Sequence, residues 1–106
     1  MEGNGAKQYR VGQLPKAKEQ VRMLGQRAIA RGILPDLTSA LRTIHSRLRS
    51  RASDWGEPLF HTHQSGGTVR KACLGGLAVV YIAYEAQKVA LIWSIEPLAS
   101  HPLAEE

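Results

Sequence analysis

Three apolar runs in the last third of the chain predict a three-stranded antiparallel meander. The runs are Thr68–Leu74, Leu77–Tyr84 and Val89–Ile95. They are rich in β-branched and aromatic residues, which favour strands. Gly75 and Gly76 separate the first two runs, and a two-residue turn needs positive φ angles that glycine adopts at no steric cost. The polar segment 85–88 is predicted to form the second turn.

These two turns predict a strand register. The expected pairs are Leu74 with Leu77, Ala72 with Val79, Arg70 with Tyr81, Tyr84 with Val89, and Val80 with Trp93. Side chains alternate between the two faces of a sheet. One face is therefore expected to carry Lys71, Cys73, Ala78, Val80, Ile82, Leu91, Trp93 and Ile95. The other face is expected to carry Arg70, Ala72, Val79, Tyr81, Ala83, Ile92 and Ser94.

Two amphipathic helices are predicted before the meander. Their apolar stripes are Ala17, Val21, Leu24 and Ala28, and then Leu37, Leu41, Ile44 and Leu48. Gly32 is a typical stop for the first helix, and Asp36 is a plausible N-cap for the second. Gly25 within the first stripe suggests a close approach of the second helix. The short linker predicts an antiparallel hairpin that packs on the meander.

The predicted fold class is α+β: an N-terminal edge strand over residues 8–14, a basic α-helical hairpin, and then the meander. The irregular segment 53–67 is expected to be a loop. Residues 8–98 are predicted to form a single domain, because 106 residues allow one modest core. Residues 1–7 are predicted to be disordered, and residues 99–106 to form a flexible tail.

Positive charge is concentrated in the helical half. The net charge of the chain is +5, but residues 7–51 hold eleven Lys and Arg against two acids, a balance of +9. Such an excess is typical of a surface that binds nucleic acid or an acidic protein. The alternative is a solvated surface with no partner.

The single cysteine and the short apolar runs indicate a cytoplasmic protein. Cys73 has no partner for an intramolecular disulfide, which favours a reducing compartment. We expect it to be a small buried side chain on its strand. The N-terminus does not resemble a signal peptide, and the longest apolar run, 77–83, is too short to span a bilayer.

A His-X-His pair, His61 and His63, is the one pattern that suggests a metal. No third and fourth ligand with convincing spacing accompanies it. We therefore predict neither a metal site nor a cofactor. The histidines are expected to lie in an exposed loop, and the functional alternative is polar contact with a phosphate backbone or proton transfer by a histidine.

The order of elements resembles the RelE/ParE superfamily of type II toxins, the plasmid stabilisation type. The supporting residues are Val79-Val80-Tyr81, the polar turn 85–88 with Val89-Ala90-Leu91-Ile92, and Leu41-Arg42-Thr43-Ile44 with Leu48. The resemblance covers about residues 9–98. It implies a toxin held inactive by a cognate acidic antitoxin. Ribosome-dependent members of this superfamily cut messenger RNA, while the ParE branch acts on DNA gyrase.

The resemblance also implies candidate site residues. Lys71 and Arg70 match the basic strand of the nuclease members, but the arginine expected three residues before the middle-strand tyrosine is Ala78 here. Glu57, together with His61 or His63, is a candidate for the base or the acid. Contacts with nucleic acid or a partner are predicted for Arg42, Arg47, Arg49, Arg51 and Tyr81.

Several functions therefore stay open. The first is a ribosome-dependent mRNA endoribonuclease, and the second is a gyrase-directed or non-catalytic binding module on the same fold. A third is a basic nucleic-acid-binding domain without a toxin role. The apolar sheet face around Val80, Leu91 and Trp93 also suggests a homodimer.

Overall fold

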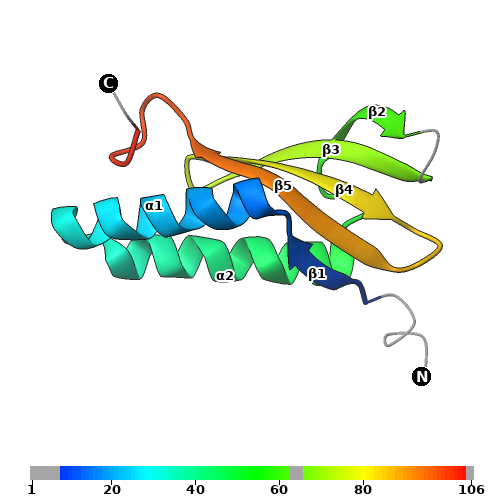
Figure 1. The fold of residues 1–106 in the computed structure, drawn as a ribbon, viewed down its shortest axis with the longest axis horizontal. Coiled ribbons are helices and arrows are strands. Elements are labelled where there is room, and N and C mark those ends of the chain that lie inside the picture. The colour runs from blue at the N-terminus through cyan, green and yellow to red at the C-terminus, as the bar shows by residue number, and fades with distance from the viewer. Residues whose placement is uncertain (1–7, 63–65, 105–106) are drawn as a thin grey trace.

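The structure, a computed structural model, describes residues 8–62 and 66–104. The elements in chain order are β1 Arg10–Gln13, α1 Pro15–Arg31, α2 Leu34–Arg51, β2 Glu57–Thr62, β3 Gly67–Leu74, β4 Leu77–Tyr84 and β5 Val89–Pro97. The two helices lie side by side along one side of a single sheet (Figure 1). This arrangement confirms the predicted α+β fold of edge strand, helical hairpin and meander.

Within the described residues the sheet has five strands, in the order β1-β5-β4-β3-β2. β1 pairs in parallel with β5, and β3, β4 and β5 form the predicted antiparallel meander. β2 is a strand that the sequence analysis expected to be a loop. Its sequence does not alternate, and Pro58 lacks an amide donor. An edge position tolerates both features, together with the register shift between Pro58 and Phe60.

Local signals account for most of the helix boundaries. Pro15 opens α1 and Gly32 ends it with a φ of 72°, in the left-handed region that suits glycine. α2 begins at Leu34, so the prediction that Asp36 is its N-cap is wrong. Asp36 lies in the first turn, where a carboxylate is favourable to the helix dipole. The predicted close approach at Gly25 is also wrong, because a Cβ placed there would have no atom within 4 Å.

The register follows the prediction up to one β-bulge. Four of the predicted pairs are present: Leu74 with Leu77, Ala72 with Val79, Arg70 with Tyr81, and Tyr84 with Val89. The fifth is wrong, since Val80 faces Ser94 and Tyr81 faces Ile92. Trp93 is the extra residue, and a bulge of this kind reverses the faces of the residues beyond it. Ile95 consequently lies opposite Val79, among the buried residues.

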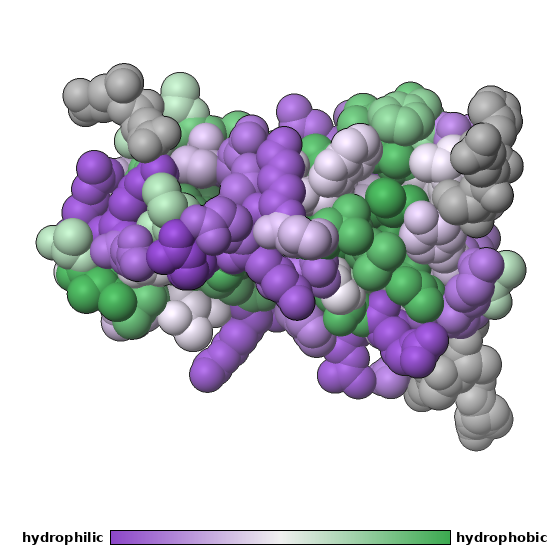
Figure 2. Space-filling view, viewed as in Figure 1, coloured by the Kyte–Doolittle hydropathy of each residue, from purple (hydrophilic) through white to green (hydrophobic). Residues whose placement is uncertain are grey.

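The two faces of the sheet differ in cover. We call the face packed against the helices the inner face. Its buried residues are Ala72, Leu77, Val79, Tyr81, Ala83, Ala90, Ile92 and Ile95. We call the opposite face the outer face. Its residues include Lys71, Cys73, Ala78, Val80, Ile82, Leu91 and Ser94. Figure 2 shows apolar side chains gathered over β4 and β5 beside the polar surface of α1.

The segment after β5 packs back onto the helices. Leu103 is 0% exposed, and its carbonyl accepts a hydrogen bond of 3.1 Å from Arg27 Nη1. The Leu98 amide donates to the Gly76 carbonyl at 2.8 Å. Residues 99–104, assigned from sequence to a flexible tail, are therefore anchored at the β3–β4 turn and on α1. The predictions for residues 1–7, 105 and 106 fall outside the described residues.

Candidate functional site on the outer face

Glu57 and Lys71 are cross-strand neighbours where β2 pairs with β3. Glu57 is the register partner of Lys71, and Lys71 is in turn opposite Val80 on β4. Directly opposed side chains share a face of the sheet and lie within reach of each other. Both residues are exposed. The fold therefore brings together two of the predicted catalytic residues on the outer face.

These two residues line a hollow of about 390 Å³ together with Trp55, Ala72 and Cys73. Cys73 is exposed, so the prediction of a buried thiol is wrong. It pairs with Ala78 on the outer face, and both helices of the described residues lie on the other side of the sheet (Figure 1). The sequence interpretation missed Cys73 and Trp55 as neighbours of the site. For Cys73 the signal was present, because a residue two positions after Lys71 on a strand shares its face.

Tyr81 fixes the segment that carries Trp55 to the sheet. Its hydroxyl accepts a hydrogen bond of 2.9 Å from the Gly56 amide and donates one of 2.8 Å to the Ala52 carbonyl. Its ring stacks on Trp55, with 6.0 Å between centroids and 20° between planes. Burial is the main cause that raises the pKa of the Tyr81 phenol, and the bond from Gly56 opposes the shift. At 0% exposed, Tyr81 is a core residue and not the partner contact expected from sequence.

Gly56 allows the loop to approach the strand closely. A Cβ on this residue would lie 2.9 Å from the Lys71 carbonyl oxygen and 3.1 Å from Cε1 of Tyr81. Contacts this short to a backbone atom are not found for real side chains. The absence of a side chain at Gly56 therefore lets the start of β2 lie against Lys71.

Arg70 lies on the other side of the sheet from Lys71. It is opposite Tyr81 on the inner face, and its Nη1 donates to the Gly56 carbonyl at 2.6 Å. The two basic residues that the sequence placed together therefore have different surroundings. In this structure Arg70 holds the loop, and Lys71 faces outward.

The histidines contribute one described residue to this region. His61 is exposed on β2, with its Nδ1 3.0 Å from Oγ1 of Thr68. His63, a predicted base or acid, lies outside the described residues. Within residues 8–62 and 66–104 the structure has no group of three metal-ligating side chains.

The four predicted contact arginines of α2 are separated into two groups. Arg42 and Arg49 line a polar hollow of about 350 Å³. Arg47 is exposed beyond this hollow, and Arg51 pairs with Asp54 at 3.4 Å. The same helix therefore presents two basic surfaces.

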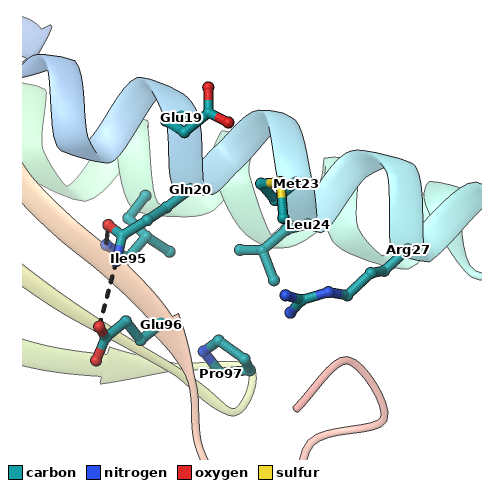
Figure 3. Close-up of a pocket in the computed structure, with 8 residues that line it drawn as sticks. All are labelled: Glu19, Gln20, Met23, Leu24, Arg27, Ile95, Glu96 and Pro97. Atoms are coloured by element: carbon teal, nitrogen blue, oxygen red, sulfur yellow. Dashed lines mark hydrogen bonds between the residues drawn. The ribbon is translucent and has the colours of Figure 1, made fainter. Parts of the chain in front are cut away.

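A third hollow, of about 360 Å³, lies between α1 and the end of β5 (Figure 3). Gln20 crosses it: its Oε1 accepts the Ile95 amide at 2.9 Å, and its Nε2 donates to Oε2 of Glu96 at 3.2 Å. β1 stops pairing with β5 at Gln13 and Ile92. Gln20 therefore accepts the backbone hydrogen bond that β5 would otherwise give to a neighbouring strand, and its role is structural.

Two solved structures are similar to this chain. A chain of the RelBE2 toxin–antitoxin complex from Mycobacterium tuberculosis matches with a TM-score of 0.65 and 16% identity, covering 88% of this chain and 94% of the other. A chain of the archaeal RelE–RelB complex from Pyrococcus horikoshii matches with a TM-score of 0.61 and 17% identity, covering 89% and 99%. This chain has a RelE-like fold. No protein-family model and no curated protein matches the sequence.

The RelE-like fold here lacks one expected cation on its outer face. Ala78, which stands where the resemblance implies an arginine, lies opposite Cys73 and is half-buried. Across the described part of the outer face, Lys71 is the basic residue nearest to the hollow of Trp55 and Glu57. The described residues that line the hollow therefore offer one cation, one carboxylate, one thiol and one aromatic ring.

Among the described residues, no helix is both long enough and apolar enough to cross a membrane.

Proposed function

We propose that this chain is the toxin-like component of a type II toxin–antitoxin pair and that its outer sheet face acts on RNA. The observation that carries the proposal is the exposed Glu57–Lys71 pair on the sheet face that the helices leave open. The RelE-like fold supports it, since both similar structures are toxin–antitoxin complexes. Such a protein would act in the cytoplasm, on messenger RNA at the ribosome.

The chemistry is an in-line attack within the RNA chain. The ribose 2′-oxygen bonds to phosphorus while the bond from phosphorus to the 5′-oxygen breaks. Glu57 takes the proton of the 2′-hydroxyl, and the Lys71 ammonium offsets the negative charge that grows on the phosphorane oxygens. The 5′-oxygen leaves with a proton, for which we propose His63 as the donor. Trp55 supplies a ring on which a base can stack.

An acidic antitoxin fits the charge of the chain. The net charge is +5 and the sequence pI is about 9.8. Opposite net charges raise the association rate and favour the correct partner. We propose that the antitoxin inhibits by covering the outer face.

Induced expression in bacteria tests the proposal. We expect growth arrest and cleaved transcripts, mapped by their 5′ ends. Lys71→Ala and Glu57→Gln should each lower cleavage by about 100-fold, the usual contribution of a positioned proton-transfer or charge-stabilising group. Lys18→Ala, an exposed α1 variant, is the control and should cleave normally. Intact transcripts with normal growth would exclude the ribonuclease.

A second candidate is a gyrase-directed or non-catalytic module on the same fold. The placement of Arg70 on the inner face and the alanine at position 78 favour it, because they leave the outer face with fewer cations. A supercoiling assay separates the two candidates. Gyrase inhibition without transcript cleavage would select the second.

A further inference from the structure

A polar stripe on α2 forms a second candidate site, away from the Glu57–Lys71 pair. Five helix residues line one hollow of about 350 Å³ together with Gln8: Arg42, His45, Ser46, Arg49 and Ser50. Their spacing of three, one, three and one residues places them along one face of a helix. All six lining residues carry hydrogen-bonding side chains, and we call them the α2 polar stripe.

The stripe carries two arginines, and neither has an ion-pair partner among the described residues. Asp36 is the single acid of α2 and lies in its first turn. Within residues 8–62 and 66–104 no ion pair involves Arg42 or Arg49, whereas Arg51 is paired with Asp54 and Arg22 with Glu19. Arg49 Nη2 donates to Oε1 of Gln8 at 3.3 Å, a bond to a neutral group. Both guanidinium groups therefore keep their charge available.

We propose that the α2 polar stripe binds the phosphodiester backbone of a nucleic acid. Seven residues of helix separate Arg42 from Arg49, a rise of about 10 Å. This distance equals about three base-pair steps measured along the axis of a duplex. Guanidinium groups bind phosphate oxygens through paired hydrogen bonds, and exposed serine and histidine side chains add further contacts.

The composition of the stripe favours a nucleic acid over a protein. Protein interfaces depend on apolar and aromatic anchors at their centre. The apolar residues of α2, Leu37, Ile44 and Leu48, are buried against the core. Among the residues that the structure describes, no large apolar side chain lines the hollow.

The inference goes beyond the proposed function. α2 packs against the inner face of the sheet, and the Glu57–Lys71 pair lies on the outer face. Backbone binding by the stripe therefore requires neither cleavage nor an antitoxin.

Salt-dependent binding tests the inference. The probes are a fluorescein-labelled 20-nucleotide RNA with 2′-O-methyl riboses, which cannot be cleaved through the 2′-oxygen, and a DNA of the same sequence. Affinity is measured by anisotropy between 50 and 200 mM KCl. The double variant Arg42→Gln/Arg49→Gln should bind about tenfold more weakly at 100 mM, and its slope of log affinity against log salt should be about 1.5 shallower.

Two further variants keep the test decisive. Arg47→Gln/Lys18→Gln removes the same number of exposed charges outside the hollow and should change the slope by less than about 0.5. Arg42→Gln alone leaves the Arg49–Gln8 bond intact and should lower the slope by about half as much as the double variant. Thermal unfolding shows that each variant is folded.

Three results would overturn the inference. The first is no binding of either probe by the wild-type protein at 50 mM KCl. The second is an equal loss in the Arg47→Gln/Lys18→Gln control. The third is tighter binding of polyglutamate than of nucleic acid, lost in the Arg42→Gln/Arg49→Gln variant, which would assign the stripe to an acidic protein.

Discussion

The inner and outer faces of one sheet have opposite roles in this protein. β4 shows the difference within a single strand, since its residues alternate strictly between buried and half-buried although nearly all of them are apolar. The inner face receives the helix stripes and carries most of the core. The outer face carries Glu57, Lys71 and Cys73, all exposed. Side chains on the inner face therefore contribute to stability, and those on the outer face are available for chemistry.

The loop before β2 is where the two faces are connected. Tyr81 and Arg70 act from the inner face, and both bind the backbone of Gly56. That segment positions Trp55 and the start of β2 beside Lys71. The hydrogen bonds of Tyr81 and Arg70 therefore hold the segment next to the exposed site, although neither residue lines the hollow.

The largest expected effect comes from comparing two adjacent valines of β4. Val79→Ala removes a fully buried side chain from the inner face and should lower the free energy of unfolding by about 2 kcal/mol. Val80→Ala, on the half-buried outer face, should cost less than about 1 kcal/mol. Urea unfolding measures both. Equal losses would contradict the assignment of the core to the inner face.

Tyr81→Phe tests the network that joins the faces. It leaves the buried Gly56 amide without its acceptor and should cost about 1 to 2 kcal/mol at pH 8. Tyr84→Phe, on the outer side of β4, is the matched control.

Tyr81→Phe should also change how the free energy of unfolding depends on pH. Burial raises the folded-state pKa of Tyr81 above its ordinary value of 10.0, so the folded protein favours the neutral phenol. The stability from Tyr81 is full below pH about 10 and is lost as the pH rises through the raised pKa, because the unfolded chain releases this proton first. Tyr81→Phe should flatten this alkaline loss. A wild-type loss above pH 10 that is unchanged in Tyr81→Phe would exclude Tyr81 as its source.

Thiol labelling compares the faces at neighbouring residues of β3. Cys73 is exposed and should react with an aromatic disulfide reagent in the native protein at pH 8. In Ala72→Cys/Cys73→Ala the thiol points to the inner face and should react at least about tenfold more slowly, since reaction requires local opening. Similar rates would mean that the inner face is not protected at β3.

The smallest change in stability is expected from a substitution inside α1. Gly25 is inside α1, and a methyl group there would meet no atom within 4 Å. Gly25→Ala should therefore raise the free energy of unfolding by about 1 kcal/mol through helix propensity. Destabilisation on thermal unfolding would show that α1 needs a glycine for packing at this position.

Much of the fold was predictable because local rules and tertiary packing agree. Gly75 and Gly76 set the β3–β4 register, and Pro15 and Gly32 bound α1 as expected. β2 was missed because Glu57–Thr62 has neither alternation nor a buried face, and its pairing with β3 is what makes it a strand. The candidate site was predictable in part. Glu57 and Lys71 are register partners on the outer face, whereas Arg70 lies on the inner face.

The helices, the meander and the basic character of the helical half follow from periodicity, turn residues and charge, which are all visible in the sequence. Only the tertiary structure decided which face each side chain occupies. Because of the bulge at Trp93, Ser94 lies on the outer face and Ile95 on the inner face. The helices cover Tyr81, whereas Cys73 is exposed. The physical reason is that one extra residue in a strand reverses its faces, and cover depends on elements far away in the chain.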